Sequence, residues 1–413
     1  MRLGEVANGD ASSYGKPLDG VRVLALEQMQ ALPYATQLLA RLGADVVKVE
    51  SPRGGDSGRA SQPAITDPEG RSVGATFLRN NFNKRSVTID LKDPAGRDLV
   101  LRLAPRFDIF AENFKAGALD RMGLGYEAVL AAHPRVIYLS VSGFGNSGSE
   151  YSEWPAYASV AEAMSGIYEF KRQTGRPPEV SPVGGLADIA SGLFGVIGIL
   201  SALRQRDKTD EGQRVDVAML DSMVAMADLV MNFWSLGLRN GEVGPVIMSG
   251  FEADDGWFIL QVGREHQFET LARLVGRADW LEDPRFADRQ GWVDALETEI
   301  RPAIDAWARG LSKAEAARRL SAAGLAAGPC LRDDEVVVDP HLVARNMIVE
   351  MPREDGIDQP VLVPGNPVKL SKVAEGPERR VPWLGEHTTE VLRAELGLTD
   401  AELAELREQG AVG

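Results

Sequence analysis

The first half of the chain alternates between two kinds of hydrophobic pattern. Short, nearly continuous apolar runs predict buried strands at residues 21–26, 44–50, 87–91, 108–111 and 136–142. Between them, apolar residues with helical spacing predict helices at residues 34–42, 95–103 and 126–132. Because strands and helices alternate in this way, we expect an α/β domain with a doubly wound, mostly parallel, Rossmann-like sheet.

One long apolar segment follows Asp188 and predicts a buried helix. The alternating stretch at 212–219 then predicts a half-buried strand, and a methionine-rich helix capped by Asp221 comes after it. We expect the methionines of this helix to fill a core rather than to form a cofactor site.

The pattern of hydrophobic and polar residues changes at about residue 237. A hairpin is expected at 251–262, and helices follow up to residue 323. Beyond them, strand-like pieces near Val336 and Ile348 precede a terminal helix. These changes predict four parts: a polar tail at 1–16, a large domain at 17–236, a smaller α+β domain at 237–328, and a C-terminal part at 329–413 that returns to the large domain.

Charge and composition argue against several classes of protein. The 413 residues include 45 Lys and Arg against 60 Asp and Glu, and the resulting net charge of −15 argues against a nucleic-acid or anionic-membrane partner. The first 16 residues lack the apolar region of a signal peptide, and the apolar runs at 192–203 and 223–234 are shorter than a membrane span. We therefore expect a cytoplasmic protein.

Familiar cofactor and metal motifs are weak or missing. Segment 143–148 fits G-x-G-x-x-G, but the residues after it do not open a helix that could receive a pyrophosphate. The first strand-to-helix turn, at 27–33, has no glycine, which argues against a nicotinamide dehydrogenase. The single cysteine, Cys330, excludes an intramolecular disulfide and is expected to be a small buried residue, and four scattered histidines predict no metal site.

Asp188 is the most informative single residue. It stands at the start of an apolar helix, where unpaired N–H groups and the helix dipole would keep its carboxylate ionised and able to act as a nucleophile. Asp is also a preferred helix N-cap, so its position alone favours a capping role.

Several short motifs lie at intervals along the chain. They are Q-L-L-A-R-L-G-A-D-V-V-K-V-E at 37–50, Gly55-Asp56, N-K-R-S at 83–86, Glu112-Asn113-Phe114, S-G-F-G at 142–145, Ala187-Asp188, Gly212-Gln213 and L-G-E-H-T at 384–388. In this order and spacing, from about residue 18 to residue 396, they resemble the family III CoA-transferases, the CaiB/BaiF family. The resemblance favours the nucleophile over the cap for Asp188.

The resemblance implies an enzyme of the EC 2.8.3 type that moves coenzyme A from an acyl-CoA donor to a free carboxylic acid. In the family the aspartate, here Asp188, attacks the acyl-CoA to form a mixed anhydride, and CoA thiolate then forms an aspartyl-CoA thioester. The protomer would have a large CoA-binding domain and a small domain, and two protomers would interlink as a homodimer. Coenzyme A and acyl-CoA would be substrates, with no permanently bound cofactor.

The CoA contacts of the family fall on four segments of this chain. They are Gln30, Ala31, Ile89, Asp90, Leu91, Lys92, Asn113, Phe114, Lys115 and Arg121. Of these, Lys92, Lys115 and Arg121 can pair with the phosphates of CoA in an otherwise acidic protein.

Two other functions remain as alternatives. Racemases of the same family invert the carbon next to the thioester, and they use a histidine where this chain has Tyr157 and a glutamate near which Glu265 falls. We expect both residues on the substrate side, and the tyrosine favours transfer. A non-catalytic CoA-binding protein is the alternative from another class, and the intact Asp188 argues against it.

Overall fold

The protein is described by a computed structural model. It covers residues 1–66, 70–146, 148–169, 172, 174–181, 183–237, 244–353 and 355–413, with the backbone alone at residues 12, 228 and 229. The chain divides into two compact units, Met1–Gly237 with Pro340–Gly413, and Leu238–Asp339. The boundary predicted at residue 328 lies inside the second unit.

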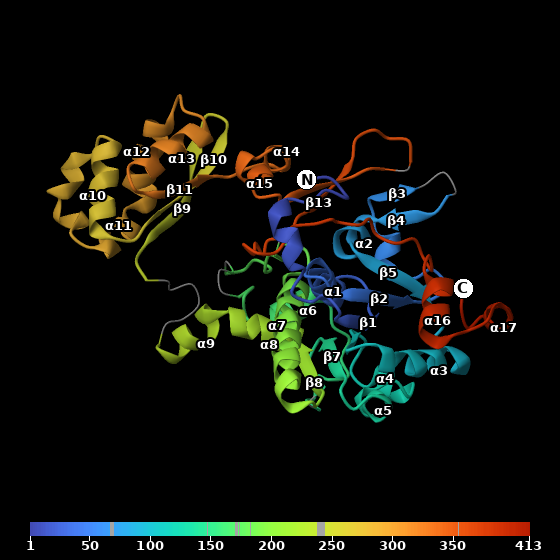
Figure 1. Cartoon of the computed structure of the whole chain (residues 1–413). Helices are drawn as coiled ribbons and strands as arrows, with labels where there is room; N and C mark the ends of the chain where they lie inside the picture. The colour runs from blue at the N-terminus through green and yellow to red at the C-terminus, as the bar shows by residue number, and fades with distance from the viewer. Residues whose placement is uncertain are drawn as a thin grey trace. The chain divides into compact units, whose positions relative to one another are not determined.

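The first unit is built on a six-stranded sheet, in which every neighbouring pair of strands is parallel (Figure 1). The strand order is β5-β2-β1-β6-β7-β8. These strands are β1 (Arg22–Leu26), β2 (Asp45–Glu50), β5 (Lys84–Thr88), β6 (Ile109–Glu112), β7 (Ile137–Ser142) and β8 (Gln213–Ala218). The order is that of a Rossmann fold, and the direction of winding reverses between β1 and β6. This confirms the predicted α/β architecture with a parallel sheet.

The helices of the first unit follow the strands in sequence. They are α1 (Ala31–Arg41), α2 (Ala75–Asn80), α3 (Pro94–Leu103), α4 (Ala118–Arg121), α5 (Tyr126–Ala132), α6 (Ala158–Met164), α7 (Leu186–Thr209), α8 (Met219–Met226), α9 (Asp228–Ser235), α15 (Pro340–Ala344), α16 (Thr388–Leu396) and α17 (Asp400–Glu408). Two short antiparallel pairs complete the unit: β3 (Ala64–Thr66) with β4 (Ser72–Gly74), and β12 (Ile348–Met351) with β13 (Val361–Pro364).

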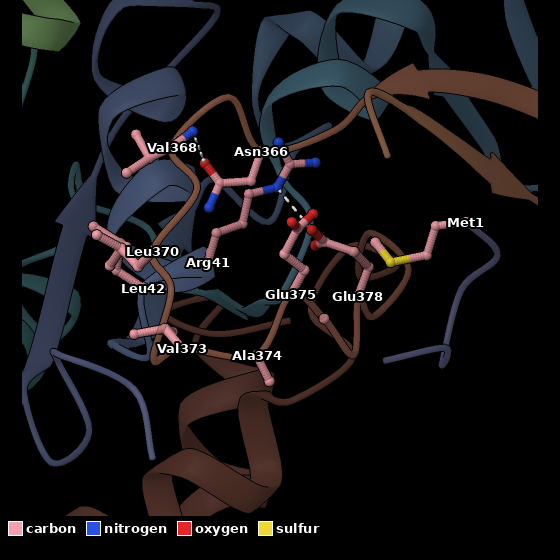
Figure 2. Close-up of a pocket in the computed structure, with 11 residues that line it drawn as sticks. Met1, Arg41, Leu42, Asn366, Val368, Leu370, Val373, Ala374, Glu375 and Glu378 are labelled. Carbon is pink, nitrogen blue, oxygen red and sulfur yellow. Dashed lines mark hydrogen bonds and ion pairs between the residues drawn. The ribbon is translucent and has the colours of Figure 1, made fainter. Parts of the chain in front are cut away.

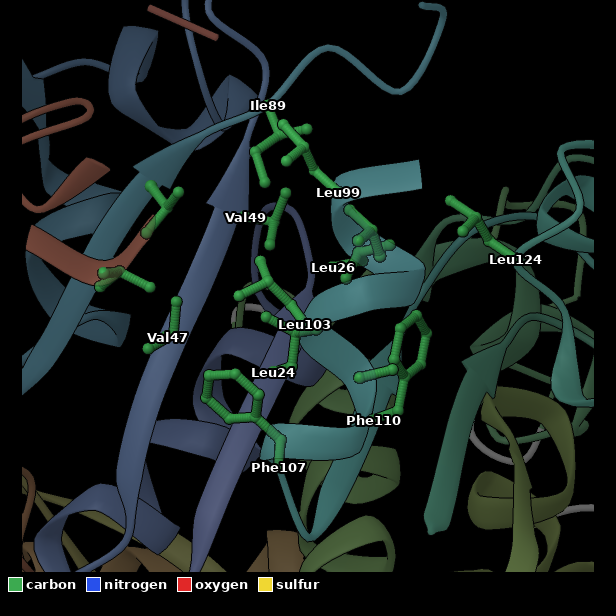
Figure 3. Packing of buried hydrophobic residues seen from close by; sticks show 14 of the residues in the cluster. Leu24, Leu26, Val47, Val49, Ile89, Leu99, Leu103, Phe107, Phe110 and Leu124 are labelled. Atoms are coloured by element: carbon green, nitrogen blue, oxygen red, sulfur yellow. The ribbon is translucent and has the colours of Figure 1, made fainter. Parts of the chain in front are cut away.

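Alternate side chains of each strand pack on opposite faces of the sheet. On β1, Leu24 and Leu26 enter one core with α3, α5 and the C-terminal helices, whereas Val23 and Ala25 enter another with α1 and α7. Figure 3 shows the first core, where Leu103 of α3 lies against the strands. Because helices cover both faces, the central strands are continuous apolar runs.

β5 begins at Lys84, whereas the sequence placed this strand at 87–91. The difference arises because the first residues of β5 are polar yet buried. Lys84 Nζ donates to Glu27 Oε1 at 2.7 Å, and Ser86 Oγ donates to Glu50 Oε1 at 2.6 Å. A hydrophobic pattern cannot reveal a strand whose buried side chains are paired polar groups.

The C-terminal part packs back onto the sheet of the first unit. Gly385 N–H donates to Ser86 Oγ at 2.9 Å, and Thr88 N–H donates to Thr388 Oγ1 at 3.0 Å. Val391 of α16 lies in the core next to α3, and Figure 1 shows the two helices near one another. The chain therefore leaves the first unit after residue 237 and returns to it.

The second unit is a small α+β assembly around an antiparallel sheet. Its strands are ordered β11-β10-β9, with β9 (Ile247–Ala253), β10 (Gly256–Val262) and β11 (Ala326–Pro329), so the predicted hairpin is confirmed. Its helices are α10 (Glu265–Leu274), α11 (Arg289–Asp294), α12 (Arg301–Ala308), α13 (Lys313–Ala322) and α14 (Asp333–Val336). Stacked aromatic rings lie in its core, where the ring centroids of Phe268 and Trp292 are 4.4 Å apart.

Four local predictions are wrong. The N-cap of α7 is Gly185, so Asp188 lies inside the helix, in its first turn, rather than at its cap. Asp221 likewise lies inside the first turn of α8. Val336 ends a short helix rather than a strand, and Cys330 is exposed rather than buried.

α7 has 24 residues and, by length and composition alone, could cross a membrane, contrary to the expectation from the apolar run at 192–203. Its Ile199, Ala202 and Leu203 instead pack in the core against the sheet. A core helix passes the same test of length and composition.

Candidate active site

A large hollow in the first unit lies where the strand order reverses. This cavity of about 340 Å³ is bounded by loops that follow β1, β6 and β7 and by the first turn of α7. Open α/β sheets bind ligands at this place, outside the carboxyl ends of the strands. The lining residues are Gln28, Met29, Gln30, Ala31, Asn113, Phe114, Lys115, Ala116, Val141, Ser142, Gly143, Ser152, Trp154, Pro155, Ala156, Tyr157, Asp188 and Met219.

A second cavity of about 150 Å³ adjoins the first, because Gln28 and Phe114 line both. Its other lining residues come from the ends of β1, β2 and β5 and from the segment after α4. They are Glu27, Val49, Glu50, Ser51, Gly55, Asp56, Ile89, Asp90, Leu91, Lys92 and Met122. We call these two neighbouring cavities at the carboxyl edge of the sheet, which share Gln28 and Phe114, the branched cavity.

The structure brings most of the predicted site residues to these two cavities. The larger one is lined by Gln30, Ala31, Asn113, Phe114, Lys115, Tyr157 and Asp188, and the smaller one by Ile89, Asp90, Leu91, Lys92 and Phe114. Arg121 ends α4 and lies outside both linings, although the next residue, Met122, lines the smaller cavity. Glu265 belongs to the second unit, where its carboxylate pairs with Arg289 at 2.8 Å.

Asp188 reaches the larger cavity from the first turn of α7. Within the described part of the chain, no group donates a hydrogen bond to its half-buried carboxylate. Burial, and secondly the negative charge of Glu162, raise the pKa of Asp188 to about 6. Most of the carboxylate is therefore ionised at pH 7, as expected, although burial raises its pKa above the usual value.

Gly185 allows the close approach of two functional side chains. Its φ is +77°, and a Cβ at this position would lie 2.3 Å from Gln30 Nε2 and 2.7 Å from Asp188 Oδ2. Gln30 Nε2 in turn donates to Gly184 O at 2.9 Å, which joins the loop after β1 to the start of α7. A residue with a side chain would separate Gln30 from Asp188.

Side-chain and backbone hydrogen bonds fix the loop after β1, residues 27–30, at two further points. Asn113 clamps Gln28, since its Oδ1 accepts from Gln28 N–H and its Nδ2 donates to Gln28 O, both at 2.9 Å. Met29 has a φ of +62°, and its N–H donates to Asp56 Oδ1 at 2.8 Å. These contacts hold a glycine-free turn in a shape that exposes its side chains to the cavity.

A cluster of buried charges lies directly beneath this loop. Lys48 Nζ lies 2.7 Å from Asp56 Oδ2, and Lys84 Nζ lies 2.7 Å from Glu27 Oε1, with these lysine side chains fully buried. Burial alone would raise the pKa of Glu27 and of Asp56, but the lysines hold both values below their usual range. Burial lowers the pKa of Lys84 to about 8.

The loop after β6 is held by another buried carboxylate. Glu112 Oε2 accepts from Phe114 N–H at 2.8 Å, and Ser140 Oγ donates to its other oxygen. Burial raises the pKa of Glu112 to about 7. Sequence reasoning named Glu112 only as part of a motif; its signal is a charged residue at the end of a buried strand.

The smaller cavity is braced by the end of the chain. Asp90 N–H donates to Ala411 O at 2.9 Å, and Val412 forms a bridge with Ile89. Lys92 is exposed at the rim, and Arg53 pairs with Asp90 at 3.3 Å. The cations Lys92 and Arg53 at this rim suit a phosphate-bearing ligand.

One wall of the larger cavity is apolar and aromatic. The rings of Phe144, Tyr151 and Trp154 contact one another, with Tyr151 and Trp154 4.8 Å apart. Tyr157 is 77% exposed, so its hydroxyl is accessible to a ligand. The predicted glycine motif at 143–148 contributes Gly143 to the lining, and its residue 147 lies outside the described residues.

A different hollow, near the N-terminus, carries no candidate chemistry. Figure 2 shows Arg41 facing Glu378, and these two side chains form a buried ion pair at 3.1 Å. The cavity between them and Asn366 has a volume of only about 20 Å³, which is room for about one water. This ion pair joins α1 to the C-terminal part.

The chain is similar to proteins of one family over nearly its whole length. The model of CoA-transferase family III matches residues 18–388. A succinate–glutarate CoA-transferase of Agrobacterium fabrum is 36% identical, with 91% of this chain and 95% of that protein covered. A formyl-CoA:oxalate CoA-transferase of Streptomyces avermitilis is 34% identical, with 96% and 100% covered. The crystal structure of a CaiB/BaiF family protein from Brucella suis matches with a TM-score of 0.80 at 35% identity, covering 92% of this chain and 99% of that one.

Proposed function

The chain belongs to CoA-transferase family III, and we propose that Asp188 is the nucleophile with which it moves coenzyme A from an acyl-CoA to a free carboxylic acid. The observation that carries this proposal is the position of Asp188 on the wall of the cavity at the reversal of strand order. Its pKa of about 6 supports the proposal, because a carboxylate that is ionised at pH 7 yet more basic than usual is a better nucleophile.

The reaction balances with the two substrates alone. Asp188 attacks the thioester carbonyl carbon, the C–S bond breaks, and CoA leaves as the thiolate, which gives a mixed anhydride. The thiolate then attacks the Asp188 carbonyl carbon and releases the donor acid as its carboxylate. The acceptor carboxylate displaces CoA from this aspartyl thioester, and a last attack by thiolate forms the product acyl-CoA and frees Asp188. Because nothing else is consumed, we propose no resident cofactor.

We place the two ends of coenzyme A in the two cavities. The adenine nucleotide would lie at the smaller cavity, near Ile89 and Lys92, and the pantetheine arm would pass Gln28 and Phe114, which line both cavities, to reach Asp188. Lys92, Lys115 and, at the rim, Arg121 would neutralise the phosphates.

The named relatives suggest which acids to test first. Further relatives are named as CoA-transferases between succinyl-CoA and mesaconate, acetyl-CoA and oxalate, and succinyl-CoA and D-citramalate, besides the formyl-CoA:oxalate enzyme. We propose that this enzyme also exchanges CoA between small carboxylic acids. A panel of these donors and acceptors, with mass spectrometry of the thioesters formed, identifies the pair.

The assembly proposed from the sequence is an interlinked homodimer. Its protomers would have the large domain, with its C-terminal part, and the small domain, whose Glu265 would lie on the substrate side. Such a dimer would be obligate, so sedimentation across a wide concentration range should show no folded monomer. We further propose a cytoplasmic enzyme without a nucleic-acid or membrane partner, as its net charge of −15 suggests.

Substitution of Asp188 tests the mechanism. Asp188→Ala should lower transfer by at least about 10³-fold, because the covalent step is lost, while CoA still binds. Hydroxylamine added to wild-type enzyme with acyl-CoA should convert Asp188 to the hydroxamate, detected by peptide mass spectrometry. Transfer by Asp188→Ala within tenfold of wild type, or a label on another residue, would contradict the proposal.

A further inference from the structure

Glu162 is a buried carboxylate that the proposed reaction does not yet use. It lies on α6 with 2% of its surface exposed. Its Oε1 accepts from Ala187 N–H at 3.1 Å, and the Tyr168 hydroxyl donates to its Oε2. Because Ala187 directly precedes Asp188 in the first turn of α7, Glu162 holds the backbone of the nucleophile.

Small side chains bring α6 and α7 close together around this contact. Ala158 and Ala161 of α6 pack with Ala187 and Ala190 of α7 in one core cluster. This packing excludes water from Glu162. In the described residues no Lys, Arg or His side chain pairs with Glu162, which contrasts with the paired carboxylates beneath the loop after β1.

Hydrogen bonds occupy both carboxylate oxygens of Glu162. The Ala187 N–H can only donate, and the Tyr168 hydroxyl is placed as the donor to the other oxygen, so each carboxylate oxygen accepts one bond. A negative charge that is buried without a cation is costly to the fold, and its retention beside Asp188 calls for a functional reason.

We propose that Glu162 is a positioning residue for the transfer reaction, which fixes the first turn of α7 and, through its negative charge, makes Asp188 easier to acylate. The inference rests on the proposed role of Asp188 as nucleophile. In the first step Asp188 Oδ bonds to the thioester carbonyl carbon and the electron pair of the C–S bond leaves with sulfur. The negative charge thereby moves from Asp188 to the CoA thiolate, away from Glu162.

The relief of repulsion explains the direction of the effect. Before the step, the carboxylates of Asp188 and Glu162 repel one another and are partly shielded from water. After the step, Asp188 is a neutral acyl group and only Glu162 remains charged. The same repulsion contributes, after burial, to the raised pKa of Asp188. Glu162 therefore favours both the attack and the accumulation of the covalent intermediate.

The other groups around Asp188 do little to offset its repulsion by Glu162. Tyr157, the N-cap of α6, and Lys115, from the loop after β6, line the same cavity, and Tyr168 contacts Glu162. Gln30 does not titrate. Lys115 is the only cation among them, and it is exposed at the mouth of the cavity, where solvent screens its charge.

The pH dependence of Glu162→Gln tests the proposal. The amide oxygen of Gln can still accept from Ala187 N–H, so this variant removes the charge and keeps the hydrogen bond. The acid limb of kcat/KM, which should lie near pH 6 in wild type, should move down by up to about one unit. Above pH 7, the rate of acyl-enzyme formation should fall by about threefold to tenfold.

Glu162→Asp is the matched variant that keeps the charge and shortens the side chain. It should leave the acid limb near that of wild type, while the transfer rate falls because Ala187 N–H loses its acceptor. Circular dichroism shows whether each variant folds, and Glu162→Met, of similar length and without charge, replaces the Gln variant if that one does not fold.

The outcomes separate this inference from the proposed function. If Asp188→Ala is inactive but the acid limb of a folded, charge-free Glu162 variant matches wild type, the role of Glu162 is overturned and the nucleophile stands. If Asp188→Ala is active, the proposed function itself fails. A downward shift in the Gln variant together with an unshifted limb in the Asp variant supports the role of Glu162.

Discussion

The two ends of the branched cavity use buried charge in opposite ways. Beneath the loop after β1, each carboxylate faces a lysine, as in the pair of Lys48 and Asp56 at 2.7 Å, and the pKa of Asp56 lies below its usual range. At the start of α7, Glu162 accepts from the N–H of Ala187, the neighbour of Asp188, and no cation pairs with either carboxylate in the described residues; the pKa of Asp188 lies above its usual range.

The difference follows from what each end has to do. In the proposed function the loop would bind the invariant part of a cofactor-like substrate and would have to keep one shape, and a carboxylate whose pKa is held low by a lysine stays ionised near neutral pH. A nucleophile must exchange its charge for a covalent bond, and this is easier when the charge is poorly stabilised. In the proposed function, pairing at one end would serve binding and repulsion at the other would serve chemistry.

The largest effect is expected where a pair is broken. Lys48→Met leaves Asp56 without its cation and should lower the free energy of unfolding by about 3–5 kcal/mol. It should also weaken CoA binding, because Asp56 Oδ1 holds Met29 N–H in the loop. Urea unfolding and titration with CoA measure the two effects.

An exposed ion pair gives the control for that experiment. Arg318→Ala removes a surface partner of Glu315, and its unfolding midpoint should be indistinguishable from that of wild type. If Lys48→Met is as stable as Arg318→Ala, buried pairing does not hold the binding end.

Two adjacent glycines provide a second contrast at the reactive end. Gly185→Ala places a methyl group 2.3 Å from Gln30 Nε2 and 2.7 Å from Asp188 Oδ2 at a positive φ, so kcat/KM should fall by about 10²-fold. Gly184→Ala meets nothing within 4 Å and should retain wild-type kinetics. Equal kinetics of the two variants would mean that the spacing between Gln30 and Asp188 is not critical.

The sequence predicted the sheet well because its central strands are apolar runs buried between helices. β1, β2, β6 and β7 lie within about one residue of their predicted positions. The start of β5 was missed because its first buried side chains, Lys84 and Ser86, are polar groups paired with Glu27 and Glu50. Hydrophobicity reports burial only where burial is apolar.

The same limit applies to the site. Gln30, Asn113, Tyr157 and Asp188 were placed by resemblance to a family, and the structure brings them to one cavity. Glu162 was missed, because its function depends on a contact between α6 and α7 that no local pattern records. A charged residue within an apolar helix face is the signal that could have drawn attention to it.

The pH dependence of wild type gives a smaller, graded effect. Asp188 must be ionised to attack, so kcat/KM should fall as pH drops through about 6, and at pH 5 it should be about tenfold below its plateau. The pKa of Asp188 is higher in the folded than in the unfolded state, so its ionisation lowers the free energy of unfolding as pH rises towards 6. Asp188→Asn cannot ionise and should therefore be more stable than wild type at pH 7.

Glu112 titrates in the same range, because burial raises its pKa to about 7. Glu112→Gln keeps an acceptor for Phe114 N–H and therefore serves as the control. If the acid limb lies near pH 4 in both wild type and Glu112→Gln, the protein stabilises the charge of Asp188 as well as water does.

The smallest effect is expected at Tyr157. By the family resemblance, racemases have a histidine at this position, so Tyr157 favours a transferase. A racemase needs a second proton-transfer group opposite the aspartate, and a phenol hydroxyl is a poorer general base than the imidazole of histidine. Wild-type enzyme with a 2-methylacyl-CoA in heavy water should thus incorporate deuterium at the α-carbon no faster than Asp188→Ala does. Tyr157→Phe should leave this background exchange unchanged. It should lower transfer by less than about tenfold, because the exposed hydroxyl can orient a substrate but takes no part in the covalent steps. Rapid exchange that requires Asp188 and Glu265 would instead assign proton transfer to this site, and the repulsion at its reactive end would then serve a base rather than a nucleophile.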